Sequence, residues 1–238
     1  MNVLVTGGCG YIGTLLTRQL LADGHKVCVI DTQWFGNYLI PNKNLKIIKQ
    51  DIRNYEEVIL NSIDTVVHLA NIANDPSVEL NSKLSWEVNV LATQKLIENS
   101  IKNNVKQFIF ASSGSVYGVK KEKNITEDLK LNPISIYNKT KMIAERVFLS
   151  FKDRISITCI RPATVCGLSE RLRLDLTVNK LTYDAFYKKK IFVDGGNQIR
   201  PNIHIKDLVA AIDYMIFCKK KLSHNIYNIG FENLKISE

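Results

Sequence analysis

The chain has 238 residues, of which 45% are hydrophobic and 23% are charged, as in an ordinary globular protein. This composition excludes intrinsic disorder, and no apolar run reaches the roughly 18 residues that a membrane-spanning helix needs. The formal charge of +9 permits an anionic partner. The lysine runs at 188–190 and 219–221 are short and accompany no recognition motif. We therefore expect solvated lysines there, with neither nucleic acid nor membrane as a partner.

The start of the sequence and its cysteines bear on location and on metal binding. The first residues run directly into an apolar strand pattern, without the basic region and cleavage site of a secretory signal. We therefore expect a cytoplasmic protein. The five cysteines have no metal-ligand or CxxC spacing, so we expect neither a disulfide framework nor a metal site.

Short apolar runs alternate with helical patterns along most of the chain. We expect buried strands at residues 2–6, 26–31, 45–50, 65–69, 107–112 and 156–161, and helices at residues 11–23, 55–61, 86–103 and 135–151. Strands and helices that alternate in this way form βαβ units. The predicted fold is therefore α/β, a doubly wound parallel sheet of the Rossmann type.

The last part of the chain is organised differently. Residues 171–190 are richer in charge, residues 225–230 follow a strand pattern, and residues 234–238 resemble the opening of a helix that does not continue. We therefore divide the chain into a Rossmann domain at residues 1–165 and a smaller, incomplete region at residues 166–238. The smaller region returns elements to the Rossmann domain.

A glycine-rich segment, TGGCGYIG at residues 6–13, joins the first predicted strand to the first predicted helix. Glycines at Gly7, Gly10 and Gly13 let the chain turn sharply and let a pyrophosphate approach bare backbone at the helix N-terminus. Asp31 ends the second strand, at the distance from this loop where a carboxylate binds a ribose hydroxyl. Because that carboxylate would repel a 2′-phosphate, we predict NAD rather than NADP as the cofactor.

Tyr137 and Lys141 are four residues apart in a predicted helix, so they lie on the same face. A free tyrosine has a pKa of about 10 and is a poor base at neutral pH, but a nearby ammonium group lowers that pKa. This spacing alone occurs by chance in many helices. It gains meaning only together with the segments that precede it.

Taken together, the ordered segments resemble the extended short-chain dehydrogenase/reductases, specifically the NAD-dependent epimerase/dehydratases that act on nucleotide sugars. The resemblance runs from residue 1 to at least residue 230. It is carried by the loop 6–13, Asp51-Ile52-Arg53, His68-Leu69-Ala70, Asn89-Val90-Leu91-Ala92-Thr93, residues 111–118 (ASSGSVYG), Tyr137 with Lys141, Arg161-Pro162 and residues 200–207 (RPNIHIKD).

This resemblance implies site residues. Tyr137 would take the proton of a sugar hydroxyl, usually at C4, while Ser113 would hydrogen-bond the reacting oxygen. Lys141 would hold the nicotinamide ribose and keep Tyr137 ionised. The implied NAD contacts are Gly7, Gly10, Tyr11, Ile12, Gly13, Asp31, Asp51, Ile52, Leu69, Ala70, Asn89, Tyr137 and Lys141. The implied contacts to a nucleoside diphosphate sugar are Ser113, Thr164 and Arg200, with Arg200 on the pyrophosphate.

Two departures from the family pattern narrow the function. Gly114-Ser115 stands where 4,6-dehydratases carry Asp-Glu, which favours a 4-epimerase that works through a transient 4-keto sugar. Thr164 stands where the family usually has Asn, which is compatible with an unusual sugar or with a change of no consequence. Three alternative functions stay open: a nucleotide-4-keto-sugar reductase, another nucleotide-sugar oxidoreductase or dehydratase, and a non-catalytic NAD-binding sensor. Family members commonly pair through a helix bundle, so we expect a homodimer.

Overall fold

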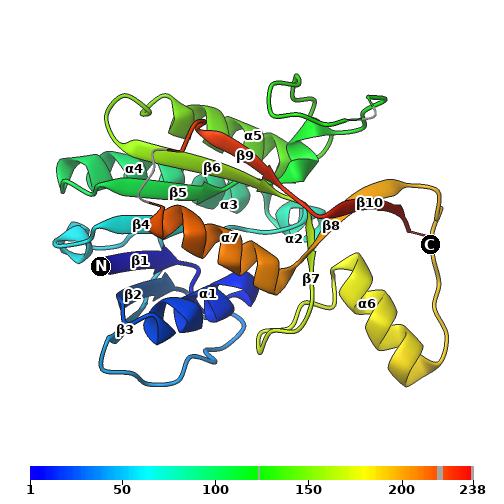
Figure 1. Cartoon of the computed structure of the whole chain (residues 1–238), viewed down its shortest axis with the longest axis horizontal. Coiled ribbons are helices and arrows are strands. Elements are labelled where there is room, and N and C mark those ends of the chain that lie inside the picture. Colours follow the sequence, from blue (N-terminus) through cyan, green and yellow to red (C-terminus); the bar gives the residue numbers. More distant parts are fainter. Residues whose placement is uncertain (123, 219–221, 237–238) are drawn as a thin grey trace.

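The computed structural model describes residues 1–122, 124–218 and 222–236, so the lysine run 219–221 lies outside the described residues. Seven parallel strands form a large sheet in the order β3-β2-β1-β4-β5-β6-β9 (Figure 1). They are β1 Asn2–Thr6, β2 Lys26–Asp31, β3 Leu45–Lys49, β4 Thr65–His68, β5 Gln107–Ala111, β6 Ser156–Pro162 and β9 Ile226–Ile229. The prediction of a doubly wound Rossmann fold is confirmed, because the strand order reverses at β1 and helices cover both faces.

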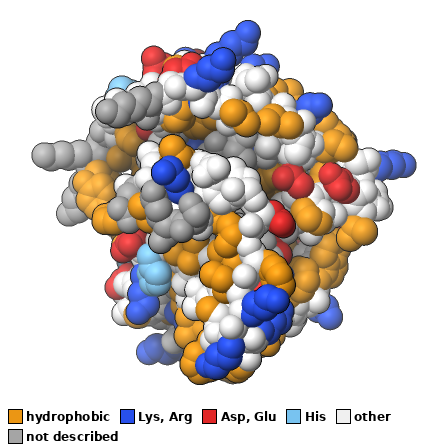
Figure 2. Space-filling view, turned by 90° about the vertical axis from the view of Figure 1, so that its right-hand side faces the viewer, with side chains coloured by type: hydrophobic (Ala, Val, Ile, Leu, Met, Phe, Trp, Pro, Cys, Tyr) orange, Lys and Arg blue, Asp and Glu red, His pale blue; other side chains and the backbone are white. Residues whose placement is uncertain are grey.

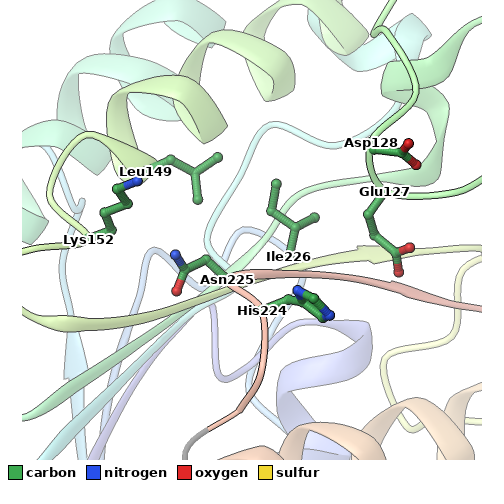
Figure 3. Close-up of a pocket in the computed structure, with 7 residues that line it drawn as sticks. All are labelled: Glu127, Asp128, Leu149, Lys152, His224, Asn225 and Ile226. Carbon is green, nitrogen blue, oxygen red and sulfur yellow. The ribbon is translucent and has the colours of Figure 1, made fainter.

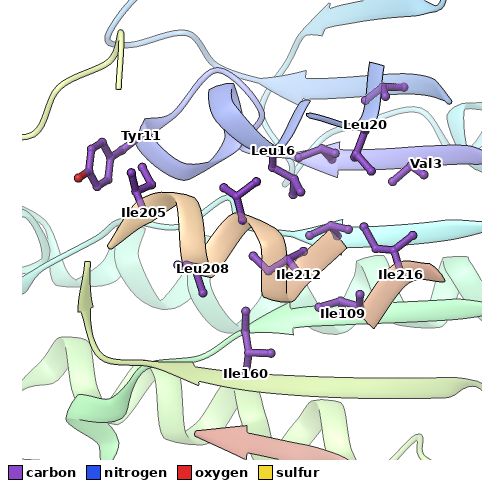
Figure 4. Packing of buried hydrophobic residues seen from close by; sticks show 14 of the residues in the cluster. Val3, Tyr11, Leu16, Leu20, Ile109, Ile160, Ile205, Leu208, Ile212 and Ile216 are labelled. Atoms are coloured by element: carbon purple, nitrogen blue, oxygen red, sulfur yellow. The ribbon is translucent and has the colours of Figure 1, made fainter. Parts of the chain in front are cut away.

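Two pairs of helices cover the two faces of this sheet (Figure 1). One face carries α1 Tyr11–Ala22 and α7 Ile205–Phe217, and the other carries α4 Ala92–Lys102 and α5 Ile136–Leu149. Figure 4 shows the first layer, where Leu16 and Leu20 of α1 meet Ile212 of α7 above Ile109 of β5. The adjacent Phe110 points to the opposite face, because side chains of a strand alternate between faces.

The second layer is built around aromatic rings. Phe148 of α5 lies with its ring centroid 5.0 Å from that of Phe108 and 5.4 Å from that of Phe110, and all three side chains are buried. Such tilted ring pairs add about 0.5–1.5 kcal/mol beyond the area they bury. This packing attaches α5 to β5, the two elements that carry the candidate active site.

Two of the predicted helices differ in detail. The helix predicted at 86–103 forms, but it begins earlier with α3 Ser82–Trp86, where Asn81 accepts the Leu84 N–H at 2.9 Å, and it includes a π-turn over Glu87–Leu91 before α4. The helix predicted at 55–61 is only a 3₁₀ turn, Glu57–Leu60. So short a segment gains too few hydrogen bonds to offset the cost of starting a helix. A further short helix, α2 Asp75–Leu80, follows β4.

A second sheet has three strands, β7 Thr164–Cys166, β8 Ile199–His204 and β10 Glu232–Lys235, in the order β10-β8-β7. The expectation of a helix that opens at residue 234 is wrong. Leu234 lies opposite Arg200 in an antiparallel pair of β10 with β8, because the chain reverses after β9 and meets the exposed edge of β8. Beside this small sheet lie α6 Thr177–Tyr183 and a π-turn, Asp184–Lys188.

The chain passes between the two sheets more than once. The domain boundary that we propose near residue 165 falls within β7, and both α7 and β9 return to the large sheet. Helix α7 was not among the predicted elements, although Ile205, Leu208 and Ile212 have helical spacing and are buried. Among the described residues, no helix is long and apolar enough to cross a membrane.

Candidate active site

The glycine-rich loop forms a bare backbone surface between β1 and α1. Gly7 has a φ of 73°, and a Cβ at this position would lie 2.7 Å from the backbone nitrogen of Ala70. A Cβ on Gly13 would overlap the carbonyl oxygen of Gly7. Gly10 precedes α1 and offers no side chain to cap its N–H groups. These glycines keep open a cradle at a helix N-terminus, against Leu69 and Ala70, which fits the pyrophosphate of a dinucleotide.

Asp31 lies at the edge of this cradle, at the end of β2. Its Oδ2 accepts the Cys9 N–H at 3.0 Å, and its Oδ1 accepts the Gln33 N–H at 2.7 Å. Burial raises the pKa of the Asp31 carboxyl, while both hydrogen bonds and the charge of Arg171 act in the opposite direction. The carboxylate is thus held in one orientation beside the loop, where we expect the ribose contact.

Tyr11 connects the glycine-rich loop to the smaller region. Its hydroxyl donates to the Gly167 carbonyl at 2.7 Å and accepts from Nδ2 of Asn179 at 3.1 Å. Its carbonyl accepts the Ser169 hydroxyl at 2.9 Å. The neighbouring Ile12 packs partly buried against the core. The side chain of Tyr11 is therefore engaged with the segment after β7.

Asp51 and Ile52 follow β3, as the resemblance implied. Asp51 pairs with Arg53 at 2.9 Å, and Arg53 also pairs with Glu87 at 2.6 Å. The hydrogen bonds and charge of Arg53 outweigh burial and lower the pKa of the Asp51 carboxyl. Ile52 is buried. These contacts hold the two residues beside the π-turn that begins at Glu87.

Asn89 lies in that π-turn and is buried. Its Oδ1 accepts the Ile72 N–H at 2.8 Å, and its amide group donates to the Ile72 carbonyl at 3.2 Å and to Oγ1 of Thr140 at 3.1 Å. Both amide hydrogens are engaged with protein atoms. Asn89 therefore ties the segment after β4 to α5.

Ser113 and Tyr137 come together beyond the carboxyl end of β5. Ser113 precedes the 3₁₀ turn Gly114–Tyr117, and Tyr137 lies in the first turn of α5. Burial raises the pKa of the Tyr137 phenol, whereas the charge of Arg173 and the Ser113 hydroxyl lower it. The structure thus places a serine hydroxyl against a phenol at the sheet edge where parallel α/β folds bind ligands.

Lys141 is buried one helical turn after Tyr137. Its Nζ donates to the carbonyl of Ala111 at 2.8 Å and lies 5.1 Å from the ring centroid of Phe110. Burial lowers the pKa of the Lys141 ammonium to about 7. In the part of the chain that the structure describes, no hydrogen bond joins Lys141 to Tyr137. The expected lowering of the Tyr137 pKa by Lys141 therefore does not appear, because the Lys141 ammonium is turned to the Ala111 carbonyl; the cation that acts on Tyr137 is Arg173.

Sequence reasoning missed Arg173. It lies between β7 and α6 and pairs with Asp175 at 2.5 Å, and Asp175 in turn accepts a hydrogen bond from Asn74. Asp75, next to Asn74, raises the pKa of Tyr137. No local signal distinguishes Arg173 from the other charged residues around it, because its place beside Tyr137 arises only from the fold.

Sequence reasoning also missed a role for Ser115 and Asn138. Oγ of Ser115 lies 2.7 Å from Oγ of Ser113, and the Ser115 hydroxyl donates to Oδ1 of Asn138 at 2.6 Å. Ser115 is part of the 111–118 motif and Asn138 follows Tyr137. A search for polar side chains beside the catalytic candidates would have found both.

A buried ion pair holds α5 against β6. Glu145 of α5 and Arg161 of β6 approach to 2.5 Å, and their side chains are 2% and 3% exposed. Arg161 also donates to the Tyr117 hydroxyl at 2.5 Å. The pair therefore links α5, which carries Tyr137, to the turn that follows Ser113.

Thr164 and Arg200 line one cavity of about 160 Å³ between the small sheet and α6. Its other lining residues are Thr177, Val178, Leu181, Asn202, Leu234, Lys235 and Ile236. The structure therefore brings these two predicted residues together, although Ser113 is not part of the lining. Figure 2 views the molecule from the side that carries the small sheet and α6, where hydrophobic side chains lie between lysines and arginines.

A larger cavity, about 420 Å³, lies elsewhere and contains none of the predicted site residues (Figure 3). Leu149 and Lys152 line it at the end of α5, and the segment around β9 supplies His224 and Asn225. Of the polar residues that surround it, Glu127 is half-buried and the others are exposed. This cavity offers no buried polar group for chemistry.

Comparisons with known proteins agree with this geometry. The NAD dependent epimerase/dehydratase family matches residues 3–230. The UDP-glucose 4-epimerase of Lactobacillus helveticus is 30% identical over 269 aligned positions, which cover 100% of this chain and 80% of that protein. The crystal structure of UDP-glucuronic acid 4-epimerase from Bacillus cereus, in complex with UDP-glucuronic acid and NAD, has a TM-score of 0.88 at 28% identity, over 99% of this chain and 80% of that one. An NAD-dependent NDP-hexosamine 5,6-dehydratase involved in tunicamycin biosynthesis has a TM-score of 0.89 at 26% identity, over 99% and 77%.

Proposed function

Because the chain belongs to the NAD dependent epimerase/dehydratase family, we propose that it is a nucleotide-sugar epimerase that inverts C4 through a transient 4-keto sugar. The family is NAD-dependent, and the glycine cradle and Asp31 fit that cofactor. The observation that carries the proposal is the approach of Ser113 to Tyr137 at the carboxyl end of β5, next to this cradle. Two of the similar proteins are 4-epimerases of UDP-sugars, which supports the choice of C4.

In the proposed mechanism, Tyr137 as phenolate takes the proton from the sugar O4, and Ser113 hydrogen-bonds the same oxygen. Burial raises the pKa of the Tyr137 phenol, and the charge of Arg173 acts against that rise and so favours the phenolate. Bound NAD supplies the acceptor for the C4 hydride and later its donor. Tyr137 returns the proton once the keto sugar presents its other face. Lys141 holds the nicotinamide ribose.

The remaining proposed contacts hold the two ligands in place. Gly7, Gly10 and Gly13 leave room for the dinucleotide pyrophosphate, and Asp31 binds the adenosine ribose. Arg200 binds the pyrophosphate of the nucleotide sugar, since a guanidinium group makes two parallel bonds to phosphate oxygens. Thr164 shares the Arg200 cavity and contacts the substrate there.

Turnover in D2O, followed by proton NMR with a panel of UDP-, GDP-, CDP- and dTDP-sugars, tests this proposal. We expect an epimer without solvent deuterium and without added reductant, because the hydride returns to the carbon that lost it. Tyr137→Phe should abolish turnover while NAD stays bound. The matched control is Tyr187→Phe, at a side chain 67% exposed, which should leave turnover unchanged. Full activity of Tyr137→Phe would overturn the proposed base.

Water elimination is a second candidate, favoured by one observation. The negative charge of Asp75 raises the pKa of the Tyr137 phenol, so a carboxylate acts electrostatically on the proposed base. The same NMR experiment separates the two reactions, because elimination yields a dehydrated keto sugar rather than an epimer. Loss of that product in Asp75→Asn would support this second candidate.

The sequence-based expectations of a cytoplasmic location and of a homodimer also remain proposals. Exposed hydrophobic side chains on the helical layer support the dimer, since Leu80 is 89% and Leu91 60% exposed. Light scattering tests it, with a mass of two chains as the expected result.

A further inference from the structure

Three polar side chains beside the reacting position form one continuous hydrogen-bonded chain. Oγ of Ser113 lies 2.7 Å from Oγ of Ser115, and the Ser115 hydroxyl donates to Oδ1 of Asn138 at 2.6 Å. Asn138 is only 9% exposed. The backbone of its helix is fixed by the Ser135 hydroxyl, which accepts the Asn138 N–H at 3.1 Å. One end of the chain is therefore the proposed catalytic serine, and the other is a buried amide.

The atom at the buried end determines the direction of the hydroxyl hydrogens. Oδ1 of Asn138 carries no hydrogen, so Ser115 uses its single hydroxyl hydrogen on it. The hydrogen between the two serines therefore belongs to Ser113, whose Oγ also accepts the Ser115 N–H at 3.2 Å. In this arrangement Ser113 can only accept a hydrogen bond, from a sugar hydroxyl or from the Tyr137 phenol, and it lowers the pKa of Tyr137 only when its hydrogen turns from Ser115 to the phenolate.

The proposed reaction requires Ser113 in both directions. A sugar hydroxyl can donate to Ser113, whereas the carbonyl oxygen of a keto sugar can only accept from it. When Ser113 turns its hydrogen toward that carbonyl, the exposed Ser115 loses the hydrogen bond from Ser113, and a return donation from Ser115 to Ser113 would fix the Ser113 hydrogen in its new direction. Ser115 is free to make this donation only if Asn138 presents a donor in place of its acceptor.

An amide side chain can make this exchange, because turning it end for end replaces its oxygen by its NH₂ group. Within the described ranges of the chain, Nδ2 of Asn138 has no hydrogen-bond partner. The turn therefore breaks only the bond to Ser115, and it forms a new one to the same atom. Neither a carboxylate nor an apolar side chain at this position could do both.

We propose that Asn138 is a positioning residue whose amide reverses the hydrogen-bonded chain, so that Ser113 accepts from the sugar hydroxyl and then donates to the keto sugar. This inference rests on the proposed function, since it assigns Ser113 to the reacting oxygen. Asn138 acts through Ser115 and touches no substrate atom.

Asn138→Asp is the sharpest single test, because a carboxylate has nearly the same shape and can only accept. We expect kcat to fall about tenfold or more, while KM for the nucleotide sugar stays within about twofold, since the lost interaction forms after substrate binding. We also expect the pH profile of kcat to move to higher pH in Asn138→Asp. This movement should equal the rise in the pKa of Tyr137. Unchanged kcat would overturn the proposal.

A double-mutant cycle separates this role from the field of the added charge. In a Ser115→Ala background the link to Ser113 is absent, so adding Asn138→Asp should lower kcat further by less than about twofold. An equal further loss in both backgrounds would overturn the proposal. Lys139→Gln at the adjacent, exposed position makes the net charge more negative by one unit, as Asn138→Asp does, and should leave kcat unchanged.

Titration of Tyr137 gives a readout that does not depend on turnover. The NAD-loaded chain, labelled with ¹³C at the tyrosine ring carbon that bears the hydroxyl, is followed by NMR against pH, with Tyr137→Phe to assign the signal. Asn138→Asp should raise the Tyr137 midpoint more in the native background than with Ser115→Ala; equal shifts would overturn the proposal. If no nucleotide sugar is converted, the proposed function fails while this comparison still stands. Asn138→Ala replaces Asn138→Asp if the latter does not fold.

Discussion

The large and the small sheet hold their functional residues in different ways. In the large sheet Val5, Val67 and Ile109 are fully buried. The glycine cradle and Ser113 lie in the loops beyond these strands, and Tyr137 lies in the first turn of α5. In the small sheet Ile199 of β8 is 64% exposed. Arg200 is placed there by pairing with β10, a segment distant in sequence. Buried parallel strands thus set the cofactor site locally, whereas the substrate cavity depends on long-range pairing. We therefore expect substitutions around the large sheet to affect NAD affinity and stability, and substitutions in the small sheet to affect KM for the nucleotide sugar.

The largest effect on ligand binding is expected at the glycine cradle. Gly13→Ala places a Cβ onto the Gly7 carbonyl, where backbone cannot move aside, so NAD affinity should fall at least about a hundredfold, or about 2.7 kcal/mol. Gly230→Ala, beside the small sheet, is the matched control: its Cβ would lie 3.2 Å from that of Ala163, and NAD affinity should stay within about twofold. Calorimetric titration with NAD measures both. Equal affinities would break the comparison.

The next effect concerns the rigidity of the large-sheet layer. Glu145→Ala leaves Arg161 charged and buried, so the free energy of unfolding should fall by about 3–5 kcal/mol. Glu57→Ala removes the partner of Lys102 in an exposed pair and should cost less than about 1 kcal/mol. Urea unfolding of both variants measures these changes. A similar cost for the two would contradict the proposed anchoring of α5.

Lys141 predicts a pH dependence of stability. Its pKa is about 7 when folded, against about 10.4 in an unfolded chain. Between these values the unfolded chain binds a proton that the folded chain does not, so the free energy of unfolding should rise with pH by up to about 1.4 kcal/mol per unit. Urea unfolding of the NAD-free chain from about pH 7 to about pH 10 should show this rise relative to Lys141→Met. Parallel curves would contradict the assigned shift.

The smallest effect is expected in the small sheet. Arg200→Ala should raise KM for the nucleotide sugar about 10- to 100-fold, because a charged hydrogen bond to phosphate contributes about 1.5–3 kcal/mol. NAD affinity should not change, since Arg200 lies in the cavity beside α6. Arg146→Ala, on the exposed surface of α5, is the control. If Arg200→Ala changed NAD affinity and left KM unchanged, the separation of the cofactor site from the substrate cavity would be wrong.

Much of the large sheet was predictable from local patterns. Near-continuous apolar runs indicate strands buried on both faces, and the parallel order follows from the helices between them. The apolar residues of helix α7 have equally regular spacing, but no helix was predicted there. The first residues of α7 belong to the 200–207 motif, which was interpreted only as part of the site. The helix expected at residue 234 is wrong because a few residues with no long-range information cannot distinguish a helix from an edge strand.

The residues of the candidate site also divide into those that local sequence motifs predict and those that only the fold brings together. Gly7, Gly13, Asp31, Ser113 and Tyr137 stand in contiguous motifs whose chemistry is legible in sequence. Only the tertiary structure placed Arg173 near Tyr137, and only it joined Ser113 to Asn138 through Ser115.

By itself, the sequence determined the parallel Rossmann sheet, the dinucleotide loop and the family, because backbone conformation and burial period are local properties of the chain. The tertiary structure decided which charges reach Tyr137, that Lys141 is buried with a pKa of about 7, and that Thr164 and Arg200 share a cavity. Electrostatic interactions and burial depend on distances through space, and those distances exist only once segments remote in sequence have packed together.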